Sequence, residues 1–203
     1  VGARHALIGP NGAGKTTFVN VITGIVESTS GQVTLDDQST LGRATHEIAR
    51  AGLVRTFQNL RLFGSLTVRE NVEAAALAAA AGRVARPRVD VDTLLDATGL
   101  TDLSDRRAGE LDYGNSRRLE LARAAATGPR FLLLDEPTSG MSDSESVAMI
   151  ERVRRVAEMV GAGVVVIDHD LNFITGICDR IYCLDQGRVI AEGTPAEIQA
   201  NPH

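Results

Sequence analysis

Short apolar runs rich in branched side chains alternate along this chain with longer stretches in which apolar residues recur at helical spacing. An apolar run of this kind, bounded by turn residues, is typical of a buried strand. Strands that alternate with helices indicate an α/β domain with a mostly parallel sheet. We expect strands at Ala6–Ile8, Gln32–Leu35, Leu53–Phe57, Phe131–Leu134, Gly163–Ile167, Arg180–Leu184 and Arg188–Ala191.

Turn and capping residues mark where several elements begin or end. The segment Asp185–Gly187 separates the last two predicted strands and predicts a hairpin. A capping box places Ser or Thr directly before a helix and Glu three residues later, and proline is favoured at the first helical position. These signals predict helix starts at Thr67 with Glu70, Ser142 with Glu145, and Thr194 with Pro195 and Glu197.

The stretch from about residue 66 to 127 differs from its surroundings because it contains helical patterns and no convincing strand. Its alanine-rich segment, Ala74–Ala81, fits a tightly packed helix, since alanine is the best helix former. We expect one domain over residues 1–203. Its α/β core would span about 1–65 and 128–203, with a helical subdomain at about 66–127 inserted into it.

Length and charge limit the classes of partner. The chain has 203 residues, enough for one well-buried core, and a formal net charge of −5. A broad nucleic-acid-binding face normally has a basic surplus, so we expect no nucleic-acid partner. The longest apolar stretch, Ala74–Ala81, is far shorter than the roughly 20 residues of a transmembrane helix. Any membrane role would therefore depend on another protein.

Residues 9–16 read Gly-Pro-Asn-Gly-Ala-Gly-Lys-Thr and fit the phosphate-loop pattern G-x-x-x-x-G-K-[ST] at every defined position. An apolar run precedes them and a helical pattern follows, which is the expected strand–loop–helix context. Backbone N–H groups of such a loop converge on one anion, Lys15 reaches toward the β- and γ-phosphates, and the Thr16 hydroxyl can bind Mg²⁺. A glycine-rich turn that only connects a strand to a helix is the less favoured alternative.

A second apolar run, Phe131–Leu134, ends in the adjacent acids Asp135 and Glu136. A strand buried on both faces would deliver Asp135 to the carboxyl edge of the sheet, where it can hold Mg²⁺ through water. Glu136 can then polarise an attacking water molecule. Many strands end in acids, so the pattern alone is weak evidence. Downstream of an intact phosphate loop it becomes strong.

Two further polar residues follow predicted strands. His169, within Asp168–Asp170, could contact a γ-phosphate, or it could be a surface histidine that caps Asp170. Gln58, directly after Phe57, could bind Mg²⁺ or orient water, although a lone glutamine is usually solvated. The residues alone leave both alternatives open.

Taken together, these pieces resemble the ATP-binding subunit of an ABC transporter, in order and over nearly the whole chain. The matching pieces are the phosphate loop, Gln58, the signature segment Leu111–Asn115, the run ending in Asp135 and Glu136, and His169. Residues 55–63 and 187–195 look most like the ATPase of branched-chain amino acid importers.

The resemblance implies a mechanism in which two such subunits close over two ATP molecules. The nucleotide would contact Gly9, Asn11, Gly12, Ala13, Gly14, Lys15, Thr16 and Thr17. Mg²⁺ would lie near Thr16, Gln58 and Asp135, Glu136 would act on water, and His169 would sense the γ-phosphate. Gln58 would also couple the metal to the membrane partner.

The resemblance further implies membrane permease subunits, a second ATPase subunit, identical or different, and indirectly a solute-binding protein. The chain would lie peripherally on the cytoplasmic face of the plasma membrane. A groove for the permease is expected at Leu60, Leu62, Phe63 and Leu66, and a pure core role for these four residues is equally open.

The chain departs from the family pattern in its signature segment, which reads Leu111, Asp112, Tyr113, Gly114 and Asn115 where relatives have Leu-Ser-Gly-Gly-Gln or Leu-Ser-Tyr-Gly-Gln. Asp112 would face the γ-phosphate of the partner's ATP, so we expect weaker closure and reduced activity at that site. Ser142 stands where relatives have Asp or Asn. Relatives also carry strands before the phosphate loop and an aromatic residue that stacks on adenine, and we expect both to be missing here.

Two alternative functions stay open. One is a soluble ABC-type ATPase, although such relatives usually carry tandem domains, coiled-coil insertions or basic extensions. The other is a hydrolysis-impaired regulatory nucleotide-binding subunit, which Asp112 keeps in consideration.

Overall fold

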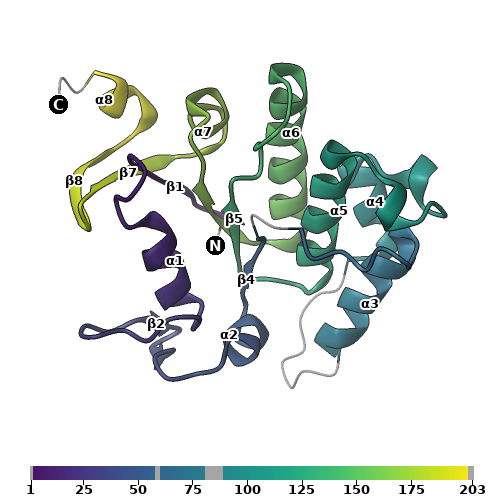
Figure 1. Ribbon diagram of the computed structural model, residues 1–203, viewed down its shortest axis with the longest axis horizontal. Helices are drawn as coiled ribbons and strands as arrows, with labels where there is room; N and C mark the ends of the chain where they lie inside the picture. Colours follow the sequence, from purple (N-terminus) through teal and green to yellow (C-terminus); the bar gives the residue numbers. More distant parts are fainter. Residues whose placement is uncertain (1, 58–59, 81–88, 201–203) are drawn as a thin grey trace.

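The computed structural model describes residues 2–57, 60–80 and 89–200. A six-stranded sheet with the order β4-β5-β6-β1-β7-β8 forms its centre, as Figure 1 shows. Every neighbouring pair is parallel except β7 and β8. The strands are β1 Arg4–Ile8, β4 Leu53–Arg55, β5 Phe131–Asp135, β6 Gly163–Ile167, β7 Arg180–Asp185 and β8 Arg188–Gly193.

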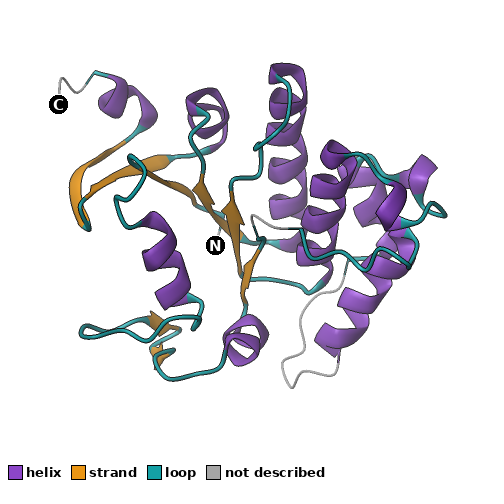
Figure 2. Cartoon of the chain, viewed as in Figure 1, coloured by secondary structure: helices purple, strands orange, loops and turns teal. Residues whose placement is uncertain are grey.

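Helices cover both faces of this sheet (Figure 2). In Figure 1, α1 and α2 lie on one side of the strands, and α6 and α7 lie on the other. The helices α3, α4 and α5 lie together beyond α6, away from β8. Their bounds are α1 Lys15–Ile22, α2 Thr45–Ala51, α3 Val68–Ala80, α4 Val91–Thr98, α5 Tyr113–Ala126, α6 Asp143–Val160, α7 Leu171–Ile177 and α8 Pro195–Gln199.

Alternating side chains of the strands divide the core into two parts. Leu132 and Leu134 of β5 belong to a large cluster with residues of α3 to α7, whereas Leu133 belongs to a smaller cluster with Val19 of α1. The same division separates Ala6 from Leu7 on β1. Successive strand residues point to opposite faces, so a sheet covered on both sides needs apolar residues at every position. This requirement explains the continuous apolar runs in the sequence.

Most predicted strands are confirmed, but the segment around residues 32–39 differs. Only Thr34–Leu35 forms a strand, β2, and it pairs with Gln38–Ser39, β3, in a separate two-stranded sheet. Asp36 and Asp37 connect them with positive φ angles of 52° and 60°. The strand β3 was not predicted, because two exposed polar residues carry no apolar pattern. The predicted strand Leu53–Phe57 also ends earlier, at Arg55.

The predicted hairpin and helix starts are confirmed. β7 and β8 are antiparallel neighbours, and Gln186 and Gly187 between them have φ angles of 45° and 76°. Positive φ at two successive residues is typical of a tight hairpin turn. The Ser142 and Thr194 pairs form capping boxes, and at the start of α3 Thr67 and Glu70 exchange the same two hydrogen bonds.

The helices α3 and α5 belong to the large core cluster, through Val68 and Val72 on α3 and Leu119 on α5. Directly before α3, Thr67 forms an isolated antiparallel bridge with Arg107, and Val68 N–H donates to Arg106 O at 2.9 Å. Among the described residues, no helix is long and apolar enough to cross a membrane.

Candidate nucleotide site

The candidate site forms where the parallel strands β1, β4, β5 and β6 end. β6 lies between β1 and β5, and β4 borders β5 on its other side. Their carboxyl ends therefore meet at one edge, which is where ligands of open α/β sheets bind. This edge carries the phosphate loop after β1, Asp135 and Glu136 at the end of β5, and Asp168 and His169 after β6.

Three glycines give the phosphate loop its shape. Gly9, Gly12 and Gly14 have φ angles of 151°, 82° and 104°, values that side-chain-bearing residues rarely adopt. Gly9 also lacks room, because a Cβ atom there would lie 2.1 Å from the carbonyl oxygen of Leu184. The β7–β8 hairpin supports the loop from the same side, since Gly187 N–H donates to Ala13 O at 2.8 Å.

The start of α1 presents free donors to the loop. Gly14 is its N-cap and supplies no side-chain hydrogen bond, and no acidic residue lies in the first turn. The first N–H groups of a helix have no partner within the helix and carry a partial positive charge, which suits a phosphate. Thr16 and Thr17 in this turn are exposed. Lys15 Nζ donates to Gly9 O at 2.6 Å and Pro10 O at 3.0 Å, so its ammonium group already lies within the loop.

Asp135 lies buried beside the loop and is paired with an arginine. Arg55 Nη2 on β4 lies 2.6 Å from Asp135 Oδ2, and Arg55 Nη1 donates to Asn20 Oδ1 on α1 at 2.7 Å. The side chains of Arg55 and Asp135 are 9% and 10% exposed. The arginine therefore neutralises one oxygen of the carboxylate, while no other ion pair of Asp135 is found among the described residues.

Glu136 adopts a rare backbone conformation directly after β5. Its φ is 50°, in the left-handed region that costs a residue with a side chain of this size free energy of order 1–3 kcal/mol. Its N–H donates to Ile167 O at 2.7 Å, which ties this turn to the end of β6. Such strain persists only where neighbouring structure fixes it, and it gathers at functional sites.

Asp168 links the segments that follow β5 and β6. This residue is 3% exposed, and its Oδ2 accepts from the Thr138 hydroxyl at 2.7 Å and from Thr138 N–H at 3.2 Å. Its Oδ1 accepts from the backbone N–H groups of His169 and Asp170. The His169 side chain is 78% exposed, with Nδ1 3.6 Å from Asp168 Oδ1. Asp170 is the N-cap of α7, and its Oδ1 accepts from the N–H groups of Asn172 and Phe173.

The signature segment begins α5. Asp112 is the N-cap, and its carboxylate accepts from Asn115 N–H at 2.7 Å and from Asn115 Nδ2 at 2.6 Å. Asp112 and Tyr113 are exposed, and the Tyr113 ring packs on Gly140, where a Cβ atom would lie 3.0 Å from Cε1. The segment therefore contacts the chain just after Glu136.

Gln58 lies outside the described residues, although its neighbour Phe57 is described. Of the residues expected to form a permease groove, Leu62 packs against the large core cluster, whereas Phe63 is 50% exposed with Arg123 4.8 Å above its ring.

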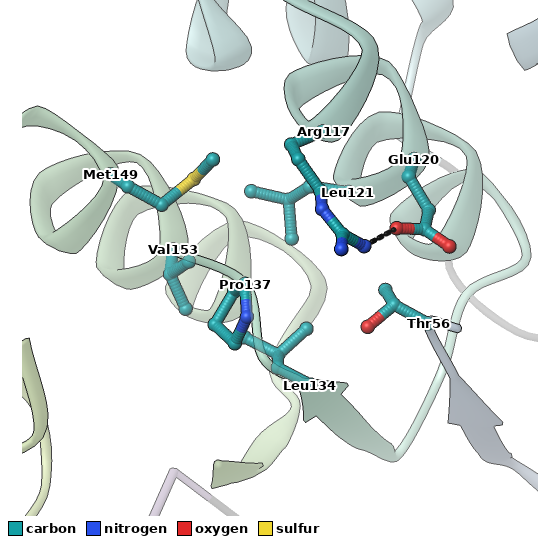
Figure 3. A pocket seen from close by; sticks show the side chains of 8 residues that line it. All are labelled: Thr56, Arg117, Glu120, Leu121, Leu134, Pro137, Met149 and Val153. Atoms are coloured by element: carbon teal, nitrogen blue, oxygen red, sulfur yellow. Dashed lines mark hydrogen bonds and ion pairs between the residues drawn. The ribbon is translucent and has the colours of Figure 1, made fainter. Parts of the chain in front are cut away.

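Sequence reasoning missed Arg55, Arg117, Glu120, Thr138 and the role of Asp168. Figure 3 shows Arg117 and Glu120 of α5 directed toward Thr56 at the end of β4. Asp168 directly follows an apolar run, as Asp135 does, and that signal could have identified it. Arg117 and Glu120 form a local pair at i,i+3, but that spacing alone is typical of an exposed helix face. Arg55 and Thr138 carry no local pattern, because their partners lie far away in the sequence.

Comparison with known proteins identifies the family. Residues 1–139 match the ABC transporter family. The chain belongs to the ABC transporter ATP-binding proteins. Members of this family bind and hydrolyse ATP.

Curated relatives extend the match over most of the chain. The branched-chain amino acid transport ATP-binding protein LivG of Salmonella typhimurium is 40% identical over 97% of this chain and 83% of its own length. BraF of Pseudomonas aeruginosa is 38% identical over the same shares. The lipopolysaccharide export ATP-binding protein LptB of Escherichia coli is 37% identical over 97% of this chain and 81% of its own.

Solved ABC cassettes share the fold. The ADP form of MJ1267, an ATP-binding cassette of an ABC transporter, superposes with a TM-score of 0.83 at 28% identity, covering 99% of this chain and 85% of that one. The ATP-binding cassette MJ0796 in a dimeric post-hydrolysis state with ADP and phosphate gives a TM-score of 0.78 at 26% identity, covering 96% and 86%. The predicted α/β phosphate-loop fold is thereby confirmed.

Proposed function

We propose that this ABC ATPase powers a membrane importer for branched-chain amino acids or similar small polar solutes. The observation that carries this proposal is the similarity to LivG over 97% of the chain. The end of the chain supports the same solute class, because residues 188–203 match the branched-chain amino acid ATP-binding cassette family. LptB, an export protein, is nearly as similar overall, so the match at residues 188–203 is what favours import of amino acids.

The nucleotide phosphates are held by the loop and the start of α1, that is, by Gly9, Asn11, Gly12, Ala13, Gly14, Lys15, Thr16 and Thr17. Support comes from the positive φ angles of its glycines and from the uncapped N–H groups of α1. Lys15 exchanges the two carbonyl groups that it now contacts for phosphate oxygens. The exchange needs only a rotation of its side chain, since both carbonyls belong to the loop.

Three side chains fit a divalent cation by their chemistry. Hydroxyl, amide and carboxylate oxygens are the ligands that Mg²⁺ prefers, and Thr16, Gln58 and Asp135 supply one of each. Bound there, Mg²⁺ would neutralise charge on the β- and γ-phosphates. Arg55 pairs with the buried Asp135 and fixes its orientation. Glu136 orients and polarises the attacking water, and His169, with its ring in solvent, contacts the γ-phosphate.

The catalytic unit contains two subunits. The cassette MJ0796 is dimeric in its post-hydrolysis state, and we extend this arrangement to this chain. The signature residues Leu111, Asp112, Tyr113, Gly114 and Asn115 then face the ATP held by the second ATPase subunit.

The chain itself forms one domain in two parts. Residues of about 66–127 act as a helical subdomain on the α/β core of about 1–65 and 128–203. Permease subunits bind peripherally attached ATPases at the cytoplasmic face of the membrane, and a solute-binding protein delivers the solute.

Asp112 favours a specific variant of this function, an asymmetric pair. The carboxylate occupies the N–H of Asn115 at the start of α5, so it competes with a phosphate for the same donor. We propose that a different second subunit supplies a competent signature segment to this chain's ATP. The ATP of that second subunit faces Asp112 and is hydrolysed slowly.

The Glu136→Gln variant tests the catalytic proposal. We expect it to bind ATP as the wild type does and to lose at least about 100-fold in turnover, the usual scale for a general base. ATP binding is measured by calorimetry and turnover by phosphate release, both on the transporter complex purified from its native membrane. Uptake of leucine and of urea into vesicles containing that complex tests the solute class.

Glu151→Gln is a matched control, because Glu151 is an exposed glutamate on α6 that pairs only with Arg154 among the described residues. It should retain full turnover. Turnover of Glu136→Gln at the wild-type rate would contradict the assignment, and uptake of urea without leucine would contradict the solute class.

A further inference from the structure

A buried arginine–glutamate pair on α5 lies between the signature segment and the end of β4. Arg117 Nη1 lies 3.1 Å from Glu120 Oε2, and the two side chains are 2% and 10% exposed. Both residues stand within α5, one turn apart, which fixes their relative position. Charged groups are rarely buried unless they are paired and hydrogen-bonded, so the remaining contacts of this pair matter.

The pair holds both backbone polar groups of Phe57. Glu120 Oε1 accepts from Phe57 N–H at 2.8 Å, and Arg117 Nη1 donates to Phe57 O at 2.8 Å. A residue has one backbone donor and one acceptor, so the pair satisfies both. Phe57 directly precedes Gln58 in the sequence. The position of α5 therefore determines where the backbone of Phe57 lies, just after the end of β4.

The same guanidinium reaches the signature segment. Arg117 Nε and Nη2 donate to the Tyr113 hydroxyl at 3.1 and 2.6 Å. The Tyr113 ring packs on Gly140, four residues after Glu136. Arg117 and Tyr113 together therefore connect three segments: the signature segment, Phe57 after β4, and the chain that follows Glu136.

The surroundings make these hydrogen bonds strong. A cavity of about 10 Å³, roughly the space of one water molecule, lies beside the pair in Figure 3. Its polar wall is Thr56, Arg117 and Glu120, and its other residues are apolar except for their backbone: Leu121, Leu134, Pro137, Met149 and Val153. Burial raises the pKa of Glu120, while the Phe57 N–H and Arg117 oppose the rise. In such a low-dielectric environment, charged hydrogen bonds strengthen and their geometry is fixed.

We infer that Arg117 and Glu120 are positioning residues, which couple the signature segment to the chain before Gln58. When the signature segment closes on the partner's ATP, Tyr113 moves with α5, and the pair displaces Phe57 with it. The inference rests on the proposed two-subunit ATPase, because only there does the signature segment meet a nucleotide. A purely structural pair would stabilise the fold without affecting catalysis.

The test compares kcat and KM for MgATP in the assembled transporter. Glu120→Gln keeps the size of the side chain but loses the ion pair, and Tyr113→Phe removes only the hydroxyl that Arg117 contacts. Each should lower kcat about tenfold, the scale of one charged hydrogen bond, with KM within about twofold. KM is spared because the phosphate loop keeps its own contacts. In the double variant the loss should be smaller than the product of the two single losses, since both changes break one linkage.

Val153→Ala is the matched structural control. Val153 lines the same cavity from α6 and has no polar contact, so its truncation should lower Tm while kcat and KM stay within about twofold of wild type. Should Glu120→Gln fail to fold, Tyr113→Phe still tests the inference. We expect this variant to fold, because Tyr113 is 42% exposed and the substitution keeps the ring.

Wild-type kcat in Tyr113→Phe, or losses that multiply independently in the double variant, would overturn the inference. The proposed function fails separately, if the wild-type complex shows no ATP hydrolysis.

Discussion

Asp112 is one residue with two opposing effects. As the N-cap of α5, its carboxylate accepts from Asn115 N–H and stabilises the helix start. Facing a phosphate, the same charge is unfavourable. Two like unit charges at about 4 Å repel by roughly 4 kcal/mol at an effective dielectric constant near 20, more than the roughly 1.5–3 kcal/mol of a good charged hydrogen bond. In the proposed two-subunit ATPase, the charge would therefore outweigh any hydrogen bond from the segment to the nucleotide.

We predict that Asp112→Ser raises the ATPase rate of the complete transporter about tenfold or more. Serine caps a helix about as well as aspartate, so stability should change by less than about 0.5 kcal/mol while the repulsion disappears. Steady-state phosphate release and thermal unfolding measure the two effects. Asp112→Asn is the control for shape, since it removes only the charge and should also raise the rate. An unchanged rate in both variants would argue against the asymmetric pair.

Arg55 illustrates what residue types alone leave open. An arginine at this position is compatible with an exposed side chain or with a contact to the permease. In the structure Arg55 lies buried between Asn20 and Asp135. Neither partner is near it in the sequence; Asp135 is 80 positions away. Only the pairing of β4 with β5 brings Arg55 to the carboxylate, with Arg55 beside Leu133 in the register.

The phosphate loop shows how an element can need glycine for two different reasons. At Gly9 the obstacle is space, because a Cβ atom would meet Leu184 O at 2.1 Å. At Gly12 no atom lies within 4 Å of such a Cβ, and the obstacle is the φ angle of 82° alone. A side chain at Gly9 must therefore displace the backbone of β7, whereas at Gly12 it needs only a strained local conformation.

We predict that Gly9→Ala abolishes ATP binding and that Gly12→Ala weakens it much less. The left-handed conformation costs alanine about 1–2 kcal/mol, so Gly12→Ala should fold and lose about 5- to 30-fold in affinity. Calorimetric titration with MgATP distinguishes the two, and circular dichroism reports whether each is folded. Gly161→Ala serves as a control for strain without a ligand, because Gly161 ends α6 with φ 65° and open space around it. Equal affinity losses at positions 9 and 12 would contradict this account.

Several carboxylates determine how the whole molecule responds to acid. The hydrogen bonds of Thr67, Ser142 and Thr194 lower the pKa of Glu70, Glu145 and Glu197, respectively. The Arg4 side chain lowers the pKa of Asp179 and so ties β1 to the start of β7. Each group binds fewer protons folded than unfolded. Its stabilising contribution is therefore present above the unfolded pKa and is lost as the pH falls through the folded pKa.

The contribution of Glu120 to stability changes with pH in the opposite direction. Burial raises its pKa, so the folded state binds more protons, and stability is lost as the pH rises from the ordinary glutamate value through the raised one. The free energy of unfolding should therefore be greatest between the lowered pKa values of the exposed carboxylates and the raised pKa of Glu120.

We predict that Tm falls steadily as the pH is lowered below about 4, the ordinary glutamate range. Glu145→Gln should lower Tm at neutral pH and flatten the acid part of the curve, because it removes one of the groups that titrate there. Calorimetric scans between neutral pH and pH 3 measure both effects. Glu151→Gln, on the same helix but outside its first turn, should leave the shape of the curve unchanged. An acid profile of Glu145→Gln identical to that of wild type would refute the assignment.

Local patterns determined much of this protein from the sequence alone. Apolar runs predicted the main strands, because a sheet covered on both faces needs apolar residues at every position. The hairpin at Asp185–Gly187 and the capping boxes at Ser142 and Thr194 were predictable because turn and cap chemistry lies within a few residues. The phosphate loop followed for the same reason, since eight adjacent residues carry the whole pattern, and the family resemblance followed from the order of several such short motifs.

Only the tertiary structure decided which distant residues meet. Phe57 is bound by Arg117, 60 positions away, and Thr138 by Asp168, 30 positions away. Such contacts depend on strand order and register and on the position of α5 beside the residues that follow β4, which no local spacing records. The buried charges Arg55, Arg117 and Glu120 look like ordinary surface residues in the sequence. Their environment was fixed only when the sheet and the helices enclosed them.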